Sequence, residues 1–389
     1  MRKKILVISE AHLIKTFVLA SILRIKEETG SRFDCFITTT VDDNVRNELL
    51  SVFENVFVNP YPKGFIKKIP KLRVLQGIWA MKRMARNFSN YDVIHFHFYY
   101  YYYALLISVL RRKTKLLFIT FFGSDFMRIN NFRHFINKKV IGKFDGVFAI
   151  NEVMLNNVRE RYLIKHKPET DIMVLLMSSF IAYKSFLSSN TPESTKASLS
   201  ITKKALVCGY SAAALMQHEH MIDALTRIED KLKPFKVIFP MTYGWRGEEI
   251  RTRVRNKLQS TSLDWTILED YMNTGQVHTL RLATDIFINL PETDQLAASL
   301  MEHLTAGNVV ITGTWLPYQY LKDKGIYFVS IDNLAELPTV LSEVIENLDY
   351  HRHKSEFNRD IILKMMSWDN IKLSWYKYYR LGEAKGDTA

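Results

Sequence analysis

Cysteine, acidic residues in the first half and long apolar runs are all scarce in this chain of 389 residues. The two cysteines, Cys35 and Cys208, stand far apart in apolar runs. This excludes a disulfide framework and a cysteine-based zinc site, and it fits a reducing compartment. No apolar run reaches the roughly 18 residues that a membrane span needs. Residues 98–110 come nearest, but they are few and rich in tyrosine. The sequence therefore predicts no membrane span.

The N-terminus lacks the pattern of a signal peptide. Residues 1–12, MRKKILVISEAH, begin basic, but their apolar run stops after six residues, so we expect a first β-strand here. Hydrophobic residues make up 47% of the chain and charged residues 24%, which is typical of a globular protein and excludes disorder. The length suits two domains.

Acidic residues are few where basic residues are many. Residues 1–200 hold 31 lysines and arginines against 16 acidic residues, a balance of +15, whereas residues 201–389 hold 22 against 24, a balance of −2. Between residues 55 and 144, 17 basic residues face only Asp92 and Asp125. This asymmetry indicates that the first half lies against something anionic, such as a membrane, a phosphate or a nucleic acid.

Short β-branched runs alternate with longer amphipathic stretches, which is typical of βαβ units and a parallel sheet. We expect strands at residues 4–9, 33–39, 55–59, 92–97, 115–121 and 146–150, and again at 204–210, 236–241, 264–268, 285–290, 308–313 and 326–330. Helices are expected over 13–28 and 72–88. Residues 185–202 are rich in serine and threonine and are typical of a linker. The sequence thus predicts an α/β protein with Rossmann-like domains over 1–184 and 204–365, a linker over 185–203 and a C-terminal segment over 366–389.

Two carboxylates follow the strand at 285–290. In open parallel sheets ligands bind beyond the carboxyl ends of the strands. Asp294 and Glu302 are eight residues apart, and Thr293 or Asp294 is a plausible N-cap whose free N–H groups would hold a phosphate or a sugar hydroxyl. The two carboxylates would bind sugar hydroxyls. Alternatively, the acids simply complement the helix dipole.

This pattern, Asp294-x7-Glu302 followed by Ala306-Gly307 and a strand, resembles the GT-B glycosyltransferases of the large E-x7-E family, similar to glycosyltransferase family 4. The strand DVIHFH, the segment KLLFITFFGSD and the segment FDGVFAINE follow that family's order. The resemblance implies two Rossmann-like domains facing across a cleft, a nucleotide-sugar donor, no metal and a C-terminal helix that crosses back to the first domain. The matching positions in the first half are Asp92, His95, His97, Gly123, Asp125, Asp145, Asn151 and Glu152.

A closer local resemblance lies in the second half. GYSAAALMQHEHMIDAL, VIFPMTYGWRGEEI and DQLAASLMEHLTAG are similar to the family of enterobacterial common antigen transferases, which move 4-acetamido-4,6-dideoxygalactose from a TDP donor to a polyprenyl-linked lipid. The positions carried over by this resemblance are Gly209, Ser211, Glu219, His220, Pro240, Tyr243, Gln295 and Ser299.

The chain departs from the large family in three places, one of which is Phe122, where the family often has a histidine. The loop after its first strand, residues 9–12, has no glycine, so a phosphate cannot approach the backbone as closely. The expected arginine and lysine after the linker strand are replaced by Tyr210 and by the segment 217–220. Arg246, His220 or the helix N-terminus near Asp294 would then neutralise the diphosphate.

A transfer reaction also needs a base for the acceptor hydroxyl. Asp125 is the preferred candidate because it lies just past a strand end beside Gly123, and Glu10, His12 and His97 are the others. An ordinary Asx-turn or helix cap explains Asp125 equally well. The HxH pairs, such as His95 and His97, lack partners at zinc spacing, so we expect neither a metal nor another cofactor.

The basic first half also carries aromatic residues. Lys63, Lys67, Lys68, Lys71 and Arg73 accompany Phe65 and Ile66, and Tyr99–Tyr103 precede Arg111, Arg112 and Lys113. Such a face suits anionic lipid headgroups and a diphosphate-linked acceptor. The alternative is a solvated basic face with tyrosines packed beneath it. No nucleic-acid-binding signature accompanies the charge, so we expect no nucleic-acid partner.

These observations favour a glycosyltransferase at the cytoplasmic face of the cell membrane. It would move a sugar from a nucleotide-sugar to a lipid-linked or glycan acceptor in cell-surface glycan synthesis. The first domain would bind the acceptor and the second the donor. Asp125 and Glu302 are the catalytic candidates, and the donor candidates are Gly209, Ser211, His220, Tyr243, Arg246, Thr293, Asp294, Gln295 and Ser299. The alternative is a non-catalytic protein of GT-B shape that binds anionic glycan or lipid.

Overall fold

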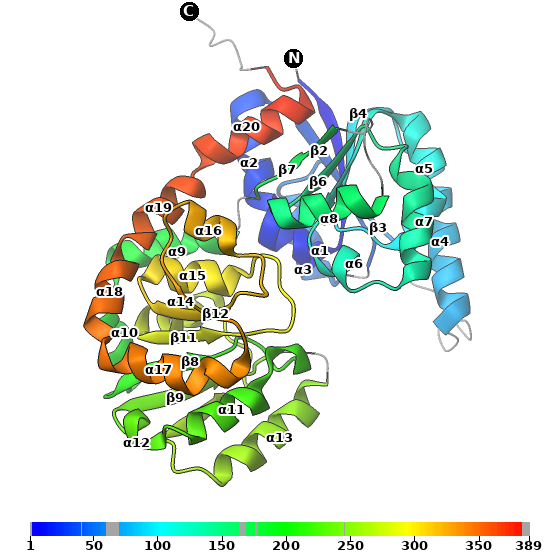
Figure 1. The fold of residues 1–389 in the computed structure, drawn as a ribbon. Helices are drawn as coiled ribbons and strands as arrows, with labels where there is room; N and C mark the ends of the chain where they lie inside the picture. The colour runs from blue at the N-terminus through cyan, green and yellow to red at the C-terminus, as the bar shows by residue number, and fades with distance from the viewer. Residues whose placement is uncertain are drawn as a thin grey trace, which may run out of the picture. The chain divides into compact units, whose positions relative to one another are not determined.

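Strands that alternate with helices along the chain build two separate parallel sheets, as the computed structural model shows (Figure 1). The structure describes residues 2–39, 41–59, 70–162, 169–175, 178–244 and 246–382. The chain divides into two units. The first comprises Met1–Ser178 and Ser367–Ala389, and the second comprises Ser179–Met366.

The sheet of the first unit has the strand order β3-β2-β1-β4-β5-β6-β7, with every neighbouring pair parallel. Its strands are β1 (Lys4–Ser9), β2 (Arg32–Ile37), β3 (Asn55–Val58), β4 (Tyr91–His97), β5 (Thr114–Phe121), β6 (Gly146–Ala149) and β7 (Glu169–Ile172). Its helices are α1 (Ala11–Leu13), η1 (Ile14–Val18), α2 (Leu19–Thr29), α3 (Asp43–Leu50), α4 (Pro70–Arg86), η3 (Tyr101–Tyr103), α5 (Ala104–Leu110), η4 (Arg111–Lys113), α6 (Ser124–Met127), α7 (Asn131–Ile141), α8 (Glu152–Tyr162) and α20 (Trp368–Tyr379).

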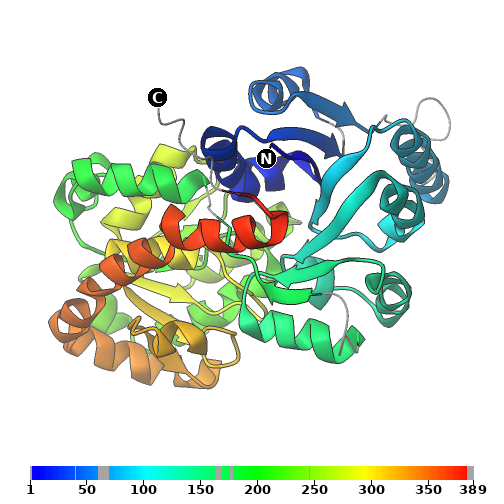
Figure 2. The same ribbon diagram turned by 90° about the horizontal axis from the view of Figure 1, so that it is seen from above.

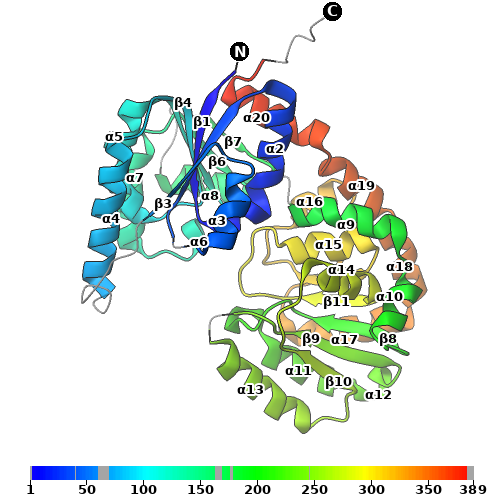
Figure 3. The ribbon, with the colours of Figure 1, turned by 180° about the vertical axis from the view of Figure 1, so that it is seen from behind.

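Successive strand residues enter different cores because side chains alternate across a sheet. In β1, Leu6 and Ile8 pack into a core with α4, α5, α7 and α8, whereas Ile5 and Val7 pack into a second core with α2, α3 and α20. The first sheet is therefore covered by helices on both faces, as Figures 1 and 3 show. Strands buried on both sides are what the near-continuous apolar runs predict.

The sheet of the second unit has the order β10-β9-β8-β11-β12-β13 and is also parallel. Its strands are β8 (Lys204–Cys208), β9 (Phe235–Pro240), β10 (Trp265–Leu268), β11 (Ile286–Asn289), β12 (Val309–Gly313) and β13 (Val329–Ile331). Its helices are α9 (Ser178–Ser189), α10 (Pro192–Ser198), η5 (Ala214–Met216), α11 (His218–Thr226), α12 (Glu229–Leu232), α13 (Gly247–Gln259), α14 (Thr274–Ala283), α15 (Ala298–Ala306), α16 (Gln319–Asp323), η6 (Leu334–Glu336), α17 (Leu337–Glu346), α18 (Leu348–Glu356) and α19 (Asn358–Met365).

The predicted fold class, two parallel-sheet α/β domains, is confirmed, and each predicted strand is present within three residues of its expected start. The sequence pattern did not reveal β7. This strand is short and reads ETDI, and its side chains are exposed or half-buried because it lies at the edge of the sheet. An edge strand with one polar face carries no apolar run to recognise.

The segment 185–203 was expected to be a linker, but the structure places helices over most of it. Its first residues complete α9, and α10 begins at a capping box in which Thr191 and Ser194 bond to each other's backbone N–H groups. Lys196 of α10 pairs with the buried Asp285 at 2.7 Å, which holds α10 on the second unit. Serine and threonine here cap a helix, a role they fill as readily as loop positions.

Helix α20 packs on the first unit although it follows the second in sequence (Figures 1 and 2). The indole of Trp368 donates a hydrogen bond to Glu28 of α2 at 2.5 Å, and the Tyr376 hydroxyl donates to the same carboxylate at 2.5 Å. Trp375 and Tyr379 are fully buried in the core beneath it. The C-terminal segment thus completes one face of the first sheet.

The expected cationic and aromatic face needs correction. Tyr99 and Tyr103 are each 1% exposed and belong to the core, because the chain turns here from β4 into η3 and α5 and directs both rings inward. Lys63, Phe65, Ile66, Lys67 and Lys68 lie outside the described residues, as do the side chains of Lys71 and Arg73. Within the part of the chain that is described, no helix is both long and apolar enough to cross a bilayer.

Candidate functional site

The second sheet has its topological switch point between β8 and β11, because the strand order runs outward from β8 to β10 on one side and from β11 to β13 on the other. This is where open parallel sheets bind ligands. Gly209 follows β8 and donates its N–H to the Ile288 carbonyl at 2.9 Å. Its φ is +67°, and a Cβ there would lie 2.6 Å from the His218 ring, so only glycine fits.

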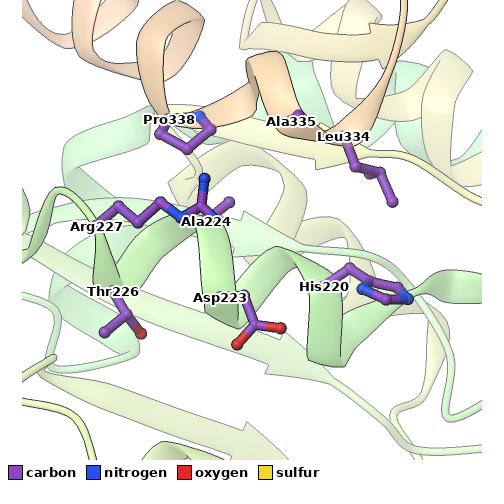
Figure 4. Close-up of a pocket in the computed structure, with 8 residues that line it drawn as sticks. All are labelled: His220, Asp223, Ala224, Thr226, Arg227, Leu334, Ala335 and Pro338. Carbon is purple, nitrogen blue, oxygen red and sulfur yellow. The ribbon is translucent and has the colours of Figure 1, made fainter.

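The loop after Gly209 is held by a buried histidine. His218 Nε2 lies 2.8 Å from the carbonyl oxygen of Ser211, and both residues are buried. Burial lowers the pKa of His218, which keeps the ring neutral and lets Nε2–H donate. His220, the histidine predicted from the sequence, is exposed and lines a hollow of about 380 Å³ between α11 and α17, with Asp223 and Arg227 (Figure 4).

A second loop lies against the first. The N–H of Ala212 donates to the Tyr243 carbonyl at 2.6 Å, and Gly244 has φ +146° with no room for a Cβ beside Ala212. Desolvation raises the pKa of the Tyr243 phenol, Arg281 lowers it, and Glu302 and Asp294 raise it. The Tyr243 hydroxyl therefore lies within the field of all three charged groups.

Arg246 begins helix α13 from the left-handed region at φ +56°, with its side chain exposed and 4.0 Å from Glu249. Glu219, another carried-over position, pairs with Arg253 at 2.7 Å, and Pro240 ends β9. Arg246 is thus exposed at the start of α13, whereas Glu219 is held in an ion pair and Pro240 is part of a strand.

The acid pair is arranged differently from the expectation at its N-terminal end. Helix α15 begins at Ala298 with Ala297 as its N-cap, so neither Thr293 nor Asp294 caps it. The Tyr318 hydroxyl donates to Asp294 Oδ2, and Gln295 N–H donates to Asp294 Oδ1 at 2.7 Å. These bonds hold the Asp294 carboxylate within the loop, and α15 begins about one turn later, at Ala298. Thr293 is exposed in the same loop.

Glu302 lies inside α15 and is 4% exposed. Its Oε2 is 3.3 Å from Nε of Arg281, which reaches it from α14 and is 5% exposed. Arg281 was not among the residues predicted from the sequence, although one signal was present: a single charge in the apolar stretch LRLA needs a buried partner. One carboxylate thus lies in the loop after β11, and the other is buried and paired.

Several buried polar atoms near this pair have no hydrogen-bond partner among the described residues. They are Nη1 of Arg281, the Ser299 Oγ and the Tyr183 hydroxyl. Glu302 raises the pKa of Tyr183 and Arg281 lowers it, although desolvation is the main cause of the rise. Buried polar groups are normally bonded, so this arrangement has donors to spare for a polar ligand. Gln295, four residues before Ser299 in the sequence, is also buried and is 7% exposed.

The first sheet has its switch point between β1 and β4. Asp125 follows β5 at the carboxyl edge of this sheet and is 2% exposed. Its carboxylate accepts hydrogen bonds from the backbone N–H groups of Tyr99 at 2.9 Å, Phe122 at 3.0 Å and Gly123 at 2.9 Å. Burial raises its pKa to about 6, against the effect of these bonds. Asp125 therefore organises the loop, and it titrates near neutral pH as a general base would.

Glu10 and His12 lie at the same edge. Glu10 accepts a hydrogen bond from the Tyr100 hydroxyl and is 3.3 Å from Nδ1 of the exposed His12. Phe98, just after β4, has φ +72°, which is unusual for a bulky residue and marks backbone strain at this edge.

His97, another base candidate, is buried in the core and so is not accessible as a base. It is 0% exposed, its ring centroid is 3.9 Å from that of His95 and 5.7 Å from that of Trp375, and burial lowers its pKa to about 3. The two histidines do share one face, as their spacing predicted. His95 bonds to Tyr379 and Thr120, each at 2.8 Å.

Other matching positions have structural partners. Asp145 pairs with Arg111 at 2.9 Å, Asp92 pairs with Lys115 at 2.8 Å, and Asn151 Oδ1 accepts the Met154 N–H at 2.8 Å. Glu152 begins α8 in its first turn. In the residues that the structure describes, no cluster of three His, Cys, Asp or Glu is suited to a metal ion.

Comparison with known proteins gives a domain match and a fold. Residues 30–170 match the Glycosyltransferase Family 4 model. No curated protein matches the chain in sequence. Among solved structures, a glycosyltransferase from Rickettsia africae has 14% identity and a TM-score of 0.72 over 97% of this chain and 98% of that one.

Two further structures match equally broadly. Sucrose-phosphate synthase from Thermosynechococcus elongatus has 13% identity and a TM-score of 0.71, covering 97% of this chain and 98% of that one. Anabaena Alr3699/HepE, solved in complex with UDP and glucose, has 13% identity and a TM-score of 0.68, covering 97% and 99%. The chain thus carries a Glycosyltransferase Family 4 domain match over residues 30–170, in a molecule whose two parallel-sheet units have the GT-B fold.

Proposed function

We propose that this protein is a glycosyltransferase that transfers a sugar from a nucleotide-sugar donor to a lipid-linked or glycan acceptor. One observation carries the proposal. The acid-x7-acid pair lies beyond β11 at the switch point of the second sheet, with Asp294 in the loop and Glu302 buried against Arg281. The family match and the HepE structures with UDP and glucose or UDP-glucose support it.

In this proposal the second unit binds the donor. Asp294 would accept hydrogen bonds from sugar hydroxyls, because an ionised carboxylate in a loop is a strong acceptor. Arg281 would position Glu302 and neutralise part of its charge. The Ser299 hydroxyl, which has no hydrogen-bond partner among the described residues, and the exposed Arg246 would donate hydrogen bonds to phosphate oxygens. Gly209 has no side chain and would let a phosphate come close to the backbone.

The acceptor would be activated from the first unit. Asp125, with its pKa of about 6, would take the proton of the acceptor hydroxyl, and Glu10 beside Tyr100 is the other carboxylate at that edge. We place the enzyme at the inner face of the cell membrane in cell-surface glycan synthesis. The local sequence resemblance to enterobacterial common antigen transferases suggests a polyprenyl-diphosphate-linked acceptor, and the donor sugar and nucleotide are left to the binding experiment below.

The donor site is tested by thermal unfolding of the full chain with UDP, GDP, TDP and CMP and their sugars. One nucleotide is expected to stabilise the protein, by about 2.7 kcal/mol at a hundredfold excess over Kd. Asp294→Asn and Glu302→Gln should abolish or weaken that shift. Glu346→Gln, which alters an exposed carboxylate paired with Lys231, should leave it unchanged.

Transfer itself is tested with the nucleotide-sugar that binds. Labelled sugar should move to polyprenyl-diphosphate-linked acceptors, and Asp125→Asn should lower kcat while keeping the nucleotide-induced shift. Binding without transfer to lipid or glycan acceptors would favour the non-catalytic alternative. Folded protein that no nucleotide stabilises would contradict the proposal.

A further inference from the structure

Three neighbouring helices of the first unit carry no acidic residue. Helices α4, α5 and α7 contain eight lysines and arginines and no aspartate or glutamate. They pack side by side over one face of the first sheet, with α5 in contact with both others (Figure 3). Their inner sides bury Ile78, Leu106 and Val140 in the core, so their outer sides form one continuous surface, called here the α4–α5–α7 face.

The outer side of α4 is a mixed stripe of apolar and basic residues. Leu75, Trp79, Arg83 and Arg86 are all exposed and follow one another at intervals of four, four and three residues, so they lie along one side of the helix. Trp79 is 62% exposed, and the Arg83 guanidinium lies 5.6 Å from its ring centroid. An exposed tryptophan on a basic stripe is costly in water unless something covers it.

The other two helices continue the same pattern. On α7, Phe132 and Phe135 are 65% and 54% exposed, and the Lys139 ammonium lies 4.2 Å from the Phe135 ring centroid. Leu105 of α5, between them, is 54% exposed. Exposed aromatic or aliphatic side chains therefore lie on all three helices, and a cation lies against the rings of Trp79 and Phe135.

We propose that the α4–α5–α7 face docks on a bilayer that contains anionic phospholipid. Apolar side chains would enter the headgroup region, and the cations would pair with lipid phosphates, which is the arrangement of interfacial membrane-binding surfaces. This deepens the proposed function by naming the surface that would bring the enzyme to a lipid-borne acceptor, and for its biological meaning it rests on that function.

The charge of the face argues against the other occupants. Two copies of this chain pairing through it would bring two all-basic surfaces together. Protein interfaces are depleted in lysine and in charged residues at their centres, whereas here cations lie beside the exposed rings of Trp79 and Phe135. An anionic membrane satisfies both the rings and the cations at once.

The test is cosedimentation of the full-length protein with phosphatidylcholine vesicles, with and without phosphatidylglycerol. Binding should require phosphatidylglycerol and weaken as salt increases. Arg83→Gln with Lys139→Gln should weaken the vesicle partition coefficient by about fivefold for each cation, the equivalent of about 1 kcal/mol. Trp79→Ala with Phe135→Ala should weaken it at every salt concentration, because the apolar contribution is not screened.

A matched control lies on the second unit. Tyr350 is 59% exposed, with the Lys354 ammonium 5.6 Å from its ring centroid, so Tyr350→Ala with Lys354→Gln removes the same chemistry elsewhere. The control should bind vesicles like the unaltered protein. Equal loss in the control, or no binding of folded protein to anionic vesicles, would overturn the proposal.

Two further measurements separate the outcomes. Light scattering that shows a dimer abolished by Trp79→Ala would assign the face to a second copy, and binding to single-stranded DNA that outcompetes vesicles would assign it to nucleic acid. Either result overturns the proposal. The face variants should retain the nucleotide-induced thermal shift, so failure of membrane docking is distinguishable from failure of the proposed function.

Discussion

Asp125 shows how burial gives one carboxylate both a structural and a chemical character. Three backbone N–H groups converge on it, which stabilises its ionised form, yet removal from water outweighs them and raises the pKa to about 6. In the unfolded chain its pKa is 3.8. Between these two values the folded protein holds the proton and the unfolded chain does not.

This difference sets a pH dependence with a definite sign. Because the folded state binds more protons in that window, the free energy of unfolding should fall as pH rises from about 4 to about 6, by about 3 kcal/mol for Asp125 alone. In Asp125→Asn this fall should disappear, as measured by urea unfolding at a series of pH values. Asp92→Asn is the control, because Lys115 and the backbone lower the pKa of Asp92 and it titrates below the window. An identical fall in Asp125→Asn would contradict the assignment.

At the scale of elements, α20 is a part of the first unit's core that is supplied from the far end of the chain. Trp375 is 0% exposed, stacks with His97 and donates its indole N–H to the Val174 carbonyl at 3.3 Å. Neither ring nitrogen of His97 has a hydrogen-bond partner among the described residues, and burial, to which Trp375 contributes, lowers the pKa of the ring and keeps it neutral. The helix therefore excludes water from the histidine pair on β4.

Truncating the Trp375 side chain tests whether α20 is part of the core of the first unit. We expect Trp375→Ala to destabilise the protein by about 3–5 kcal/mol, through lost burial and a cavity beside His97. Leu373→Ala on the same helix, at a residue 65% exposed, should change stability by no more than about 0.5 kcal/mol. The measurement is urea unfolding monitored by circular dichroism. Similar small effects from both variants would show that α20 is not part of the core.

At the scale of the whole molecule, each unit has its own sheet and its own buried core. A ligand that binds only one unit stabilises that unit's native state directly. If the second unit holds the donor, the nucleotide that binds should slow hydrogen exchange chiefly in β8, β11 and α15.

Hydrogen-exchange mass spectrometry of the full chain tests this location. Amides of β1 and β4 should exchange at nearly the same rate with and without the nucleotide, whereas those of β8 and β11 should exchange more slowly. Protection confined to the first unit would place the nucleotide there and would remove the proposed role of Asp294. Glu302→Gln should diminish the protection and provides the matched comparison.

The sequence by itself determined the fold class and the approximate position of each strand other than β7, because apolar runs buried on both faces leave a strong local pattern. It also placed Asp294 and Glu302 near one strand end, since chain order alone puts the residues after β11 at the carboxyl edge of the sheet. Gly209 was named only through the local family resemblance.

Only the tertiary structure decided which side chains meet. Arg281 reaches Glu302 from a different helix, His218 rather than His220 holds the loop after Gly209, and Trp375 covers His97 from the far end of the chain. The structure also shows that Tyr99 and Tyr103 after β4 are buried, and that the strongly exposed aromatic side chains of this unit lie instead on α4 and α7. Contacts between residues distant in sequence depend on how helices pack on a sheet, and local spacing carries no record of that packing.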